Sequence, residues 1–548
     1  MTVYLVGAGP GDPGLVTRRA AELLGEADVV VYDRLVGPDV LAMARPDALL
    51  IDVGKRPGQL HRQSDINGIL VDHGRQGGVV VRLKGGDPFL FGRGGEEAEA
   101  LRAAGLQFEV VPGVTSAFGA PAYAGIPVTH RGLSTSVTVV TGHVGEPLDS
   151  SRASSGGSSS GGPGSGEVDW AALAKAGGTL VILMGVAERA EIARRLMAGG
   201  RDPSSPVAVV EWGTLPTQTS MRTTLSRLEE AAIEPPAVIV VGPVAAIDLG
   251  WFESLPLHGI RVLVTRARAQ SAPLRNALRA AGADVVEMPM IQIVDPADGG
   301  AALRKAAASA PSYDWVAFTS VNSVERFVQL LRDGRALGPA RLAVVGNATA
   351  AALRTWHLEA DLIAEPQTAE GLAAVMPPAQ SGAAEDSPVT AGGSMAPSYG
   401  RGRVLFPRAA EGRDVLAPAL RAKGWLVDEV DAYRTVPADV SSGLRSQVED
   451  GTVDVVTFTS PSTVRSYVSQ FGVPGNWKKT PVVACMGPVT AEAARTAGIY
   501  VDVVAAHPTV EHLVAGLVEL RASGWQHAEP AHGKPVRDRG RHHLESLP

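Results

Sequence analysis

The sequence is poor in cysteine, because only one of its 548 residues, Cys485, is of this type. A single cysteine excludes an intramolecular disulfide and any metal site built from clustered cysteines. Its neighbours are small and apolar, which favours a buried side chain over a reactive nucleophile. The sequence therefore predicts no disulfide framework, and no residue spacing in it is typical of a metal site.

Aromatic residues and long hydrophobic runs are also scarce. Aromatic residues make up 5% of the chain, so the cores must be built from alanine, valine and leucine. No apolar run approaches the roughly 18 residues that span a bilayer. The first residues, MTVYLVGAGPGD, lack the basic region of a signal peptide. These absences predict a cytoplasmic protein with no membrane partner.

A strongly basic composition is missing as well. The formal net charge is −7, with acidic and basic residues interspersed, whereas nucleic-acid binding usually needs a basic face. We therefore expect no nucleic-acid partner. An anionic small molecule is still a suitable substrate, because a few arginine and lysine residues in a cleft suffice to bind it.

Three segments are of low complexity. Residues 149–166 are almost entirely glycine and serine, and residues 377–400 and 526–548 are also poor in large apolar side chains. Such segments bury too little surface to offset their ordering entropy. We expect the first two to be flexible loops and the third to be a disordered tail.

The remaining length suits two to four domains. One α/β pattern ends near residues 251–259, and a new strand starts at 261–266, so we expect domains at 1–250 and 256–525. In the first domain, β-branched runs alternate with helical patterns, which is typical of parallel α/β architecture. The expected strands are VYLVG, ADVVVYD, GGVVVRLKGGD, FEVVPG, VTVVTGH, TLVILMG, PVAVVEWGT and AVIVVGPV.

The second domain contains an internal repeat. Residues 274–294 resemble 416–436, and 316–328 resemble 456–468. The paired positions Leu278/Leu420, Phe318/Phe458 and Gly346/Gly487 are 142, 140 and 141 residues apart. This nearly constant offset predicts two similar α/β lobes with an active site in the cleft between them.

Glycines follow the first strand, in VGAGPGDP (6–13), and at first suggest a dinucleotide-binding turn. That motif needs glycine at position 12, where Asp12 stands, and its carboxylate would repel a pyrophosphate. A nicotinamide site is therefore disfavoured. The glycines still let the backbone approach a ligand closely where the strand ends.

Two further motifs carry chemistry. In VVVRLKGGDPFLFGRGGEE (79–97), a strand ends in a glycine-rich turn that offers backbone donors and the Asp87 carboxylate to a ribose or an ammonium group. In VVPGVTSAFGAPAYAGIPVTHRG (110–132), small residues permit packing against a flat ligand. Both patterns indicate a ligand site, although a simple turn before a helix explains part of the first.

Together with VYDRLV (31–36), VGKRPG (53–58), VTGH (140–143), LMG (183–185) and EWGT (211–214), these motifs resemble the uroporphyrinogen-III C-methyltransferases. The likeness implies a two-subdomain tetrapyrrole methylase fold that binds S-adenosylmethionine between its subdomains, and a homodimer formed through this half. By resemblance, the methyl donor contacts Pro10, Gly85, Gly86, Asp87, Leu90, Thr115, Ser116, Met184 and Gly213.

The same resemblance assigns acid–base work to Asp33 and Lys55, for which a surface salt bridge is the structural alternative. Methylation of a pyrrole carbon needs the sulfonium aligned for in-line displacement, so positioning supplies much of the rate. A base can then remove a proton. The substrate carries eight carboxylates, and its candidate partners are Arg34, Arg56, Lys84, His130 and Arg131.

The second domain resembles uroporphyrinogen-III synthase in its repeat and in six short motifs. These are FTS (318–320), GNATA (346–350), AYRT (432–435), FTSPST (458–463), MGPVTA (486–491) and AHPT (506–509). The likeness implies a bilobal α/β fold with a β-ladder hinge. PMIQIVDP (289–296) and DEVDAYRTVP (428–437) are the candidate hinge strands.

That resemblance implies closure of hydroxymethylbilane with inversion of its last ring, without a metal or cofactor. Hydroxyl and backbone N–H groups should hold the substrate carboxylates. Thr349, Ser460, Ser462 and Thr509 match such positions, and Tyr433 is the candidate to assist loss of the hydroxyl. Helix capping by the hydroxyls and hinge packing by Tyr433 are the structural alternatives.

The preferred hypothesis is a bifunctional enzyme that makes uroporphyrinogen III and methylates it twice to precorrin-2. One alternative keeps only the methyltransferase active and gives the second domain a substrate-binding role. A bilobal binding protein of the periplasmic type is a third, disfavoured by the missing signal sequence. A three-activity siroheme synthase is excluded because no segment offers a complete dinucleotide fingerprint, and the sequence leaves open whether the product feeds siroheme or cobalamin.

Overall fold

The computed structural model describes residues 2–54, 62–142, 168–379, 402–412, 414–473 and 480–525. It divides into two compact units that meet in sequence near Arg261. Met1–Arg261 makes up most of the first unit and Val286–Leu517 most of the second. The three low-complexity segments fall almost entirely outside the described residues, so the expectations for them stay predictions. Within the described residues, no helix combines the length and apolar composition needed to cross a bilayer.

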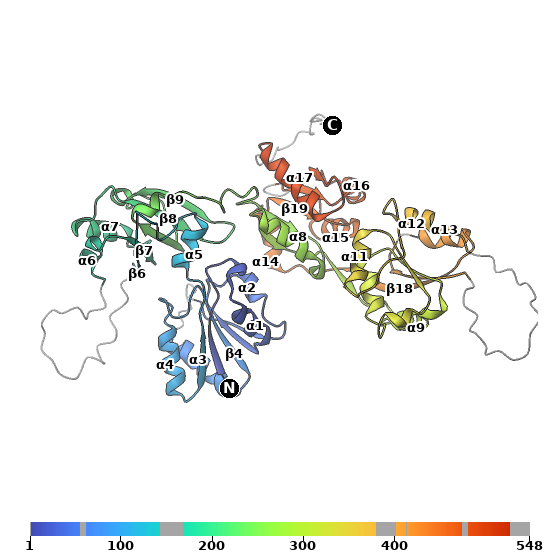
Figure 1. The fold of residues 1–548 in the computed structure, drawn as a ribbon, viewed down its shortest axis with the longest axis horizontal. Helices are drawn as coiled ribbons and strands as arrows, with labels where there is room; N and C mark the ends of the chain where they lie inside the picture. The colour runs from blue at the N-terminus through green and yellow to red at the C-terminus, as the bar shows by residue number, and fades with distance from the viewer. Residues whose placement is uncertain are drawn as a thin grey trace, which may run out of the picture. The chain divides into compact units, whose positions relative to one another are not determined.

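The first unit opens with a five-stranded sheet in the order β3-β2-β4-β1-β5, in which every neighbouring pair is parallel. Helix α1 packs on one face, and α3 and α4 pack on the other. The sheet is thus doubly wound, as the alternating pattern predicted (Figure 1). Its strands are β1 (Thr2–Gly7), β2 (Val29–Tyr32), β3 (Leu49–Asp52), β4 (Val79–Lys84) and β5 (Gln107–Val111), and its helices are α1 (Arg18–Glu26), α2 (Pro38–Leu41), α3 (Gln63–Gln76) and α4 (Gly94–Ala103).

A second five-stranded sheet follows, in the order β6-β7-β10-β8-β9. Only β6 and β7 are parallel, so the expectation of a parallel sheet is wrong here. A short connection joins β8 to β9 and forces them antiparallel, since parallel neighbours need a long crossover. The strands are β6 (Val137–Thr141), β7 (Thr179–Leu183), β8 (Pro206–Glu211), β9 (Thr219–Thr224) and β10 (Ala237–Val241); the helices are α5 (Ser116–Tyr123), α6 (Trp170–Lys175) and α7 (Arg189–Ala198).

All eight expected strands of this unit are present, but β3 and β9 were not foreseen. Both are edge strands, and Leu49 and Leu50 of β3 are exposed. Strand β9 reads TSMRTT, with no buried residue in its pattern. Because an edge strand has only one neighbour to pack against, its sequence carries a weak hydrophobic signal.

The second unit has two lobes, each built on its own sheet. The five-stranded sheet has the order β12-β11-β19-β20-β21 and the six-stranded sheet the order β13-β18-β17-β14-β15-β16. Separate hydrophobic clusters fill the lobes. The strands are β11 (Arg261–Val264), β12 (Asp284–Glu287), β13 (Ile291–Val294), β14 (Trp315–Phe318), β15 (Arg341–Val344), β16 (Leu362–Ile363), β17 (Arg403–Ala409), β18 (Leu426–Pro437), β19 (Val455–Phe458), β20 (Val482–Cys485) and β21 (Val503–Val504).

Ten helices accompany these strands in the described part of the second unit. Those that follow β14 and β19 start at equivalent positions of the repeat, and the ring pairs Phe318/Phe327 and Phe458/Tyr467 occupy matching places. The helices are α8 (Arg268–Ala280), α9 (Ala301–Ala308), α10 (Val321–Val328), α11 (Asn347–Arg354), α12 (Ala369–Val375), α13 (Leu416–Ala422), α14 (Ser442–Glu449), α15 (Pro461–Phe471), α16 (Pro488–Thr496) and α17 (Val510–Ala522).

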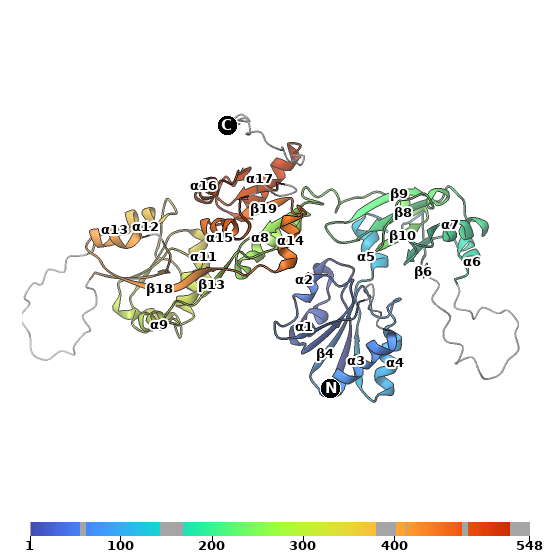
Figure 2. The ribbon, with the colours of Figure 1, turned by 180° about the vertical axis from the view of Figure 1, so that it is seen from behind.

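Each lobe combines parts of both sequence repeats. The five-stranded sheet takes β11 and β12 from the first repeat and β19 to β21 from the second, and the six-stranded sheet takes the complementary strands. The chain passes from one lobe to the other between β12 and β13, and it returns after the long strand β18. This strand starts parallel to β17 and ends antiparallel to β13, with Ile291 opposite Pro437 and Val294 opposite Arg434 (Figure 2). The predicted hinge strands therefore form the ladder between the lobes.

Candidate functional site

Three loops meet at the carboxyl ends of β1, β4 and β5. The backbone of Gly9 and that of Gly86 exchange two hydrogen bonds of 3.2 and 2.7 Å. A Cβ atom on Gly7 would lie 2.5 Å from the nitrogen of Gly113, and one on Gly113 would lie 2.2 Å from the oxygen of Gly86. Only glycine fits these contacts, so the loops form one surface made largely of backbone, at the sheet edge where open α/β sheets bind ligands.

Asp87 fastens two of these loops together. Its Oδ1 accepts the N–H of Phe89 at 2.8 Å, and its Oδ2 accepts the N–H of Gly113 at 3.1 Å. Thr115 caps helix α5 by accepting the N–H of Ala117, and a Cβ on Gly86 would lie 3.8 Å from the nitrogen of Ser116. The structure thus brings Gly86, Asp87, Thr115 and Ser116 together.

Helix α5 packs on the second sheet, where its alanines share a hydrophobic cluster with residues of β7, β8 and β10 (Figure 1). A Cβ on Gly119 would lie 2.8 Å from the side chain of Pro10, and one on Gly213 would lie 2.3 Å from that of Ala120. Leu90 packs against the same cluster, which also includes Leu183 beside Met184. The predicted donor residues from both sheets therefore gather around α5.

A buried ionic network lies behind Asp33, which follows β2. Arg82 Nη2 donates to Asp33 Oδ1 at 2.8 Å, and Arg82 Nε donates to Glu97 Oε1 at 3.1 Å. Lys84 Nζ lies 2.9 Å from Glu97 Oε1 and 3.9 Å from Asp33 Oδ2. The Asp33 side chain is 32% exposed, whereas that of Glu97 is fully buried. Asp33 is thus the one carboxylate of this network that a ligand can reach.

Burial lowers the pKa of Lys84, and the nearby charge of Arg82 lowers it further. Residue Lys84 is 4% exposed, and its ammonium group donates a hydrogen bond to Glu97 Oε1. Contact of Lys84 with substrate carboxylates stays a prediction. In the structure, Lys84 is an ionic partner of Asp33.

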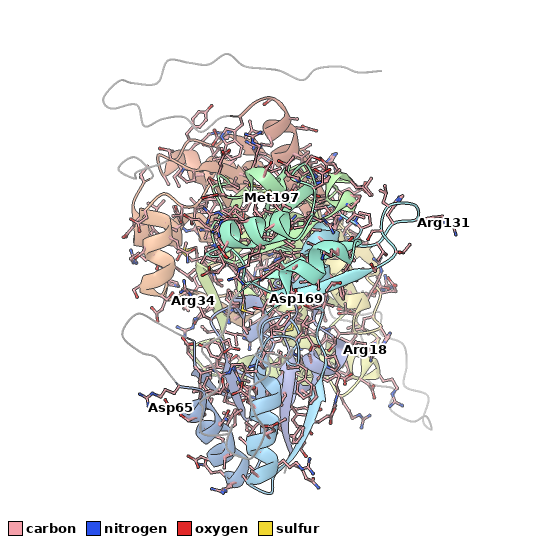
Figure 3. All side chains as sticks on the ribbon, turned by 90° about the vertical axis from the view of Figure 1, so that its left-hand side faces the viewer. Arg18, Arg34, Asp65, Arg131, Asp169 and Met197 are labelled. Atoms are coloured by element: carbon pink, nitrogen blue, oxygen red, sulfur yellow. The ribbon has the colours of Figure 1, made fainter. Side chains whose placement is uncertain are left out.

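The other predicted cationic partners lie in three places. Arg34 is exposed and lies against Gly54, whose added Cβ would come within 2.9 Å of the Arg34 backbone nitrogen. Lys55 and Arg56 come directly after Gly54 but lie outside the described residues. His130 and Arg131 belong to an exposed turn, and Arg131 points away from the ribbon (Figure 3).

In the second unit, Tyr433 of β18 donates its hydroxyl to Ser320 Oγ at 3.1 Å. Tyr433 is 7% exposed. Ser320 also caps α10 through the N–H of Ser323. Because β18 continues directly into the ladder with β13, Tyr433 stands where the six-stranded sheet passes into the hinge.

The remaining predicted hydroxyls occupy helix starts. Ser460 caps α15 and contacts Ser462 Oγ at 2.8 Å. Thr509 lies at the start of α17, where its Oγ1 accepts the N–H of His512. Thr349 is buried in α11, as Thr490 is at the equivalent position of α16. The capping alternative therefore holds for Ser460 and Thr509, while a substrate role stays a prediction for all four.

Comparison with known proteins follows the same division. A family model described as tetrapyrrole (corrin/porphyrin) methylases matches residues 2–229, and one described as uroporphyrinogen-III synthase HemD matches residues 272–515. The porphyrin biosynthesis protein HemD of Ruminiclostridium josui is 36% identical over 536 residues, covering 94% of this chain and 98% of that protein.

The chain belongs to the HemD family of porphyrin-biosynthesis proteins.

It therefore joins a methylase half, matched over residues 2–229, to a synthase half, matched over residues 272–515. The uroporphyrinogen-III C-methyltransferase of Bacillus subtilis is 41% identical over 335 residues, covering 60% of this chain and 65% of that protein. The solved uroporphyrin-III C-methyl transferase of Thermus thermophilus, complexed with S-adenyl homocysteine, is 42% identical and covers 44% of this chain and 98% of that one, with a TM-score of 0.37.

The methylase half of this HemD-family chain has a surface that suits an adenosyl ligand. Met184, Trp212 and Thr214 adopt positive φ angles of 54°, 50° and 72°, which non-glycine residues rarely do outside functional sites. Met184 and Trp212 are nevertheless 51% and 43% exposed. Exposed apolar side chains held in such conformations offer packing for a flat ring, and the glycine loops offer N–H groups.

Three residues of these sites escaped sequence reasoning. Arg82 and Glu97 were read only as parts of a glycine-rich motif, and Ser320 only as part of a repeat. An arginine inside the apolar strand VVVRLK was an available signal, because a buried arginine needs a partner. Ser320 aligns with Ser460, which was singled out, so the repeat itself offered the second signal.

Proposed function

We propose that this chain catalyses two consecutive reactions of tetrapyrrole biosynthesis. The synthase half closes hydroxymethylbilane to uroporphyrinogen III with inversion of the last ring. The methylase half then transfers two methyl groups from S-adenosylmethionine and forms precorrin-2. The observation that carries this proposal is the likeness to one relative along nearly the whole length of both chains, with a methylase and a synthase model matched in the same order.

In the methylase half, the loops around α5 orient the donor. S-adenosylmethionine supplies a methyl group on a sulfonium, and the chain supplies alignment, which is the larger part of this catalysis. The backbone groups of Gly85, Gly86 and Gly213 contact it. Gly213 also lets its loop pack closely on Ala120 of α5, while Asp87 and Thr115 hold the loop ends. The donor therefore meets the substrate over a surface of fixed backbone.

Asp33 acts on the proton that the methylated pyrrole must lose. Its carboxylate is held by Arg82 through Oδ1, which leaves Oδ2 facing Lys84 and the exposed side. Lys55 assists from the segment after Gly54, and Arg34, Arg56, His130 and Arg131 bind the carboxylates of the macrocycle. Arginine suits this task because its planar fork pairs with a carboxylate through two hydrogen bonds.

In the synthase half, Tyr433 donates a proton to the leaving hydroxyl. Its O–H is directed to Ser320, so Ser320 holds the proton donor in place. Thr349, Ser460, Ser462 and Thr509 and the first N–H groups of their helices bind acetate and propionate side chains. Carboxylates are stabilised at helix N-termini, which offer free N–H groups.

The domains extend over residues 1–250 and 256–525, and the protein works in the cytoplasm as a homodimer formed through the methylase half. Light scattering tests this assembly. One chain has a mass of 56.7 kDa, and we expect twice this mass in solution. A measured mass equal to that of one chain would refute the dimer.

A coupled assay tests the two activities. The full chain, supplied with hydroxymethylbilane and S-adenosylmethionine, should form a methylated type III macrocycle. Asp33→Asn should stop at unmethylated uroporphyrinogen III, and Tyr433→Phe should still methylate uroporphyrinogen III supplied directly. If the full chain methylates uroporphyrinogen III but yields only the uninverted isomer from hydroxymethylbilane, the synthase half is a binding module and this part of the proposal is wrong.

A further inference from the structure

The segment that follows the methylase half, residues 251–259, is packed against the end of helix α5 and against residues 218–220. Trp251 donates its ring N–H to the carbonyl of Ala122 at 3.0 Å, and its ring lies 5.0 Å from that of Tyr123. Phe252 is 7% exposed and lies 4.8 Å from the same tyrosine ring. The junction is therefore an ordered part of the first unit.

Glu253 makes two of the polar contacts of this segment. Its Oε1 accepts from Gln218 Nε2 at 2.7 Å, and its Oε2 accepts the N–H of Ser220 at 3.2 Å. His258 Nε2 contacts the carbonyl of Gln218 at 2.9 Å and must donate there, because a carbonyl only accepts. The two bonds to the Glu253 carboxylate are charge-assisted, and such bonds are among the stronger ones in proteins.

A chain of hydrogen bonds continues from Gln218 to the donor loops. The fully buried Gln218 amide accepts the N–H of Thr214 at 2.7 Å, and Thr214 Oγ1 accepts the N–H of Asp12 at 3.1 Å. Asp12 Oδ2 in turn accepts from the Tyr123 hydroxyl at 2.5 Å. Since Tyr123 packs on Trp251 and Phe252, the chain of contacts begins and ends in residues 251–253.

The order of donors and acceptors makes this chain directional. Glu253 only accepts, so the Gln218 amide must turn its NH₂ group toward it and its oxygen toward Thr214. Thr214 has a φ angle of +72°, which a threonine keeps only when its surroundings hold it. Loss of Glu253 frees the amide to turn, and Thr214 then loses its fixed acceptor.

We infer that Glu253 is a positioning residue for S-adenosylmethionine, acting through Gln218, Thr214 and Asp12. Thr214 directly follows Gly213 in the chain, and Asp12 lies two residues after Pro10. The hydrogen bonds of Thr214 and Asp12 therefore hold the loops that carry Gly213 and Pro10. The inference rests on the proposed function, because it concerns the donor site of the methylase half. It extends that site into the segment that joins the two enzymes.

Calorimetric titration of the full chain with S-adenosylhomocysteine tests this role. Glu253→Ala should raise the dissociation constant by about 5-fold or more, as expected for a coupled site. Glu253→Gln keeps one acceptor for Gln218 and should recover part of the affinity. The control is Glu229→Ala, an exposed glutamate of the same unit, which should bind like the wild type.

Kinetics separate positioning from a loss of folding. In Glu253→Ala the KM for S-adenosylmethionine should rise, while the KM for uroporphyrinogen III and the synthase rate of the same polypeptide stay unchanged. If Glu253→Ala fails to fold, Glu253→Gln replaces it, because it keeps the size of the side chain and removes one of the two carboxylate acceptors. It should weaken S-adenosylhomocysteine binding in the same direction and by a smaller factor.

Two results would overturn the inference, and they are distinguishable. A folded Glu253 variant that binds S-adenosylhomocysteine with the affinity of the wild type would contradict the positioning role and leave the proposed function intact. No binding of S-adenosylhomocysteine by the wild-type chain would contradict the proposed function, and the inference with it.

Discussion

Arg82 holds the partly buried carboxylate of Asp33, the proposed acid–base residue, and Glu97 in turn holds Arg82. The network contains two acidic and two basic residues, so its formal charges balance. Glu97 is fully buried, and its Oε2 is without a hydrogen-bond partner among the described residues. Buried ion pairs contribute little net stability, but removing one member leaves a charge uncompensated. Their value here is to fix where the Asp33 carboxylate points.

Glu97→Gln should change the pH dependence of methyl transfer. Glu97 opposes the lowering of the Lys84 pKa that burial and Arg82 cause, so its neutralisation lowers that pKa further. Lys84 then loses its proton at a lower pH, and we expect the alkaline limb of the rate profile to move to lower pH. Stability should fall by about 3–5 kcal/mol, as measured by denaturant unfolding.

The matched control for this substitution is Glu99→Gln, because Glu99 is an exposed glutamate of the same helix, α4. It should leave the profile in place. An active Glu97→Gln variant with an unmoved alkaline limb would show that Lys84 does not take part in the reaction.

Tyr433→Phe should reduce the synthase rate by about 100-fold, the low end of what a positioned acid contributes. The ring remains buried against its cluster, so folding should be kept and methyl transfer unaffected. Formation of the type III isomer, followed by chromatography, measures the effect. Tyr500→Phe, at a tyrosine that is 72% exposed, is the control, and a full rate in Tyr433→Phe would remove Tyr433 from the mechanism.

Among the secondary-structure elements, the helix starts of the synthase half combine an observed capping role with a proposed role in substrate binding. Ser320 and Ser460 cap α10 and α15 at equivalent positions of the repeat. A cap is worth about 1 kcal/mol, and serine and aspartate are similarly effective at it. Aspartate also carries a negative charge, which repels a carboxylate substrate. This difference separates capping from binding.

Ser460→Asp should therefore keep the stability of the chain and raise the KM for hydroxymethylbilane. Ser441 caps α14 in the same lobe without a predicted substrate role, so Ser441→Asp should change neither quantity. Thermal unfolding and initial rates measure the two effects. An unchanged KM in Ser460→Asp would assign Ser460 to capping alone.

At the scale of the whole molecule, the described hydrophobic clusters each draw on one half of the chain. Each half therefore has its own cores and can unfold as its own cooperative transition. In the synthase half, each of the two sheets contains strands from both sequence repeats, so neither repeat forms a lobe alone. The two lobes should unfold together.

S-adenosylhomocysteine should accordingly stabilise one transition of the full chain and leave the other unchanged. At a free concentration of 100 times its dissociation constant, a ligand raises the free energy of unfolding of the domain that binds it by about 2.7 kcal/mol. Differential scanning calorimetry with and without S-adenosylhomocysteine measures the two transition temperatures. A shift of both by the same amount would mean that the halves unfold as one unit.

The sequence by itself determined the order of the two enzymes, the eight first-half strands and the hinge pair, because hydrophobic periodicity and turn residues are local signals. It also predicted close backbone contacts at the glycine-rich strand ends, which the structure shows at Gly7, Gly86 and Gly113, whereas the contact of these loops with the methyl donor stays a prediction. Only the tertiary structure decided the mixed second sheet, the exchange of strands between repeats, and the partners of Asp33 and Tyr433. Arg82, Glu97, Ser320 and Glu253 lie far along the chain from the groups they hold, and the path of the backbone brings them together.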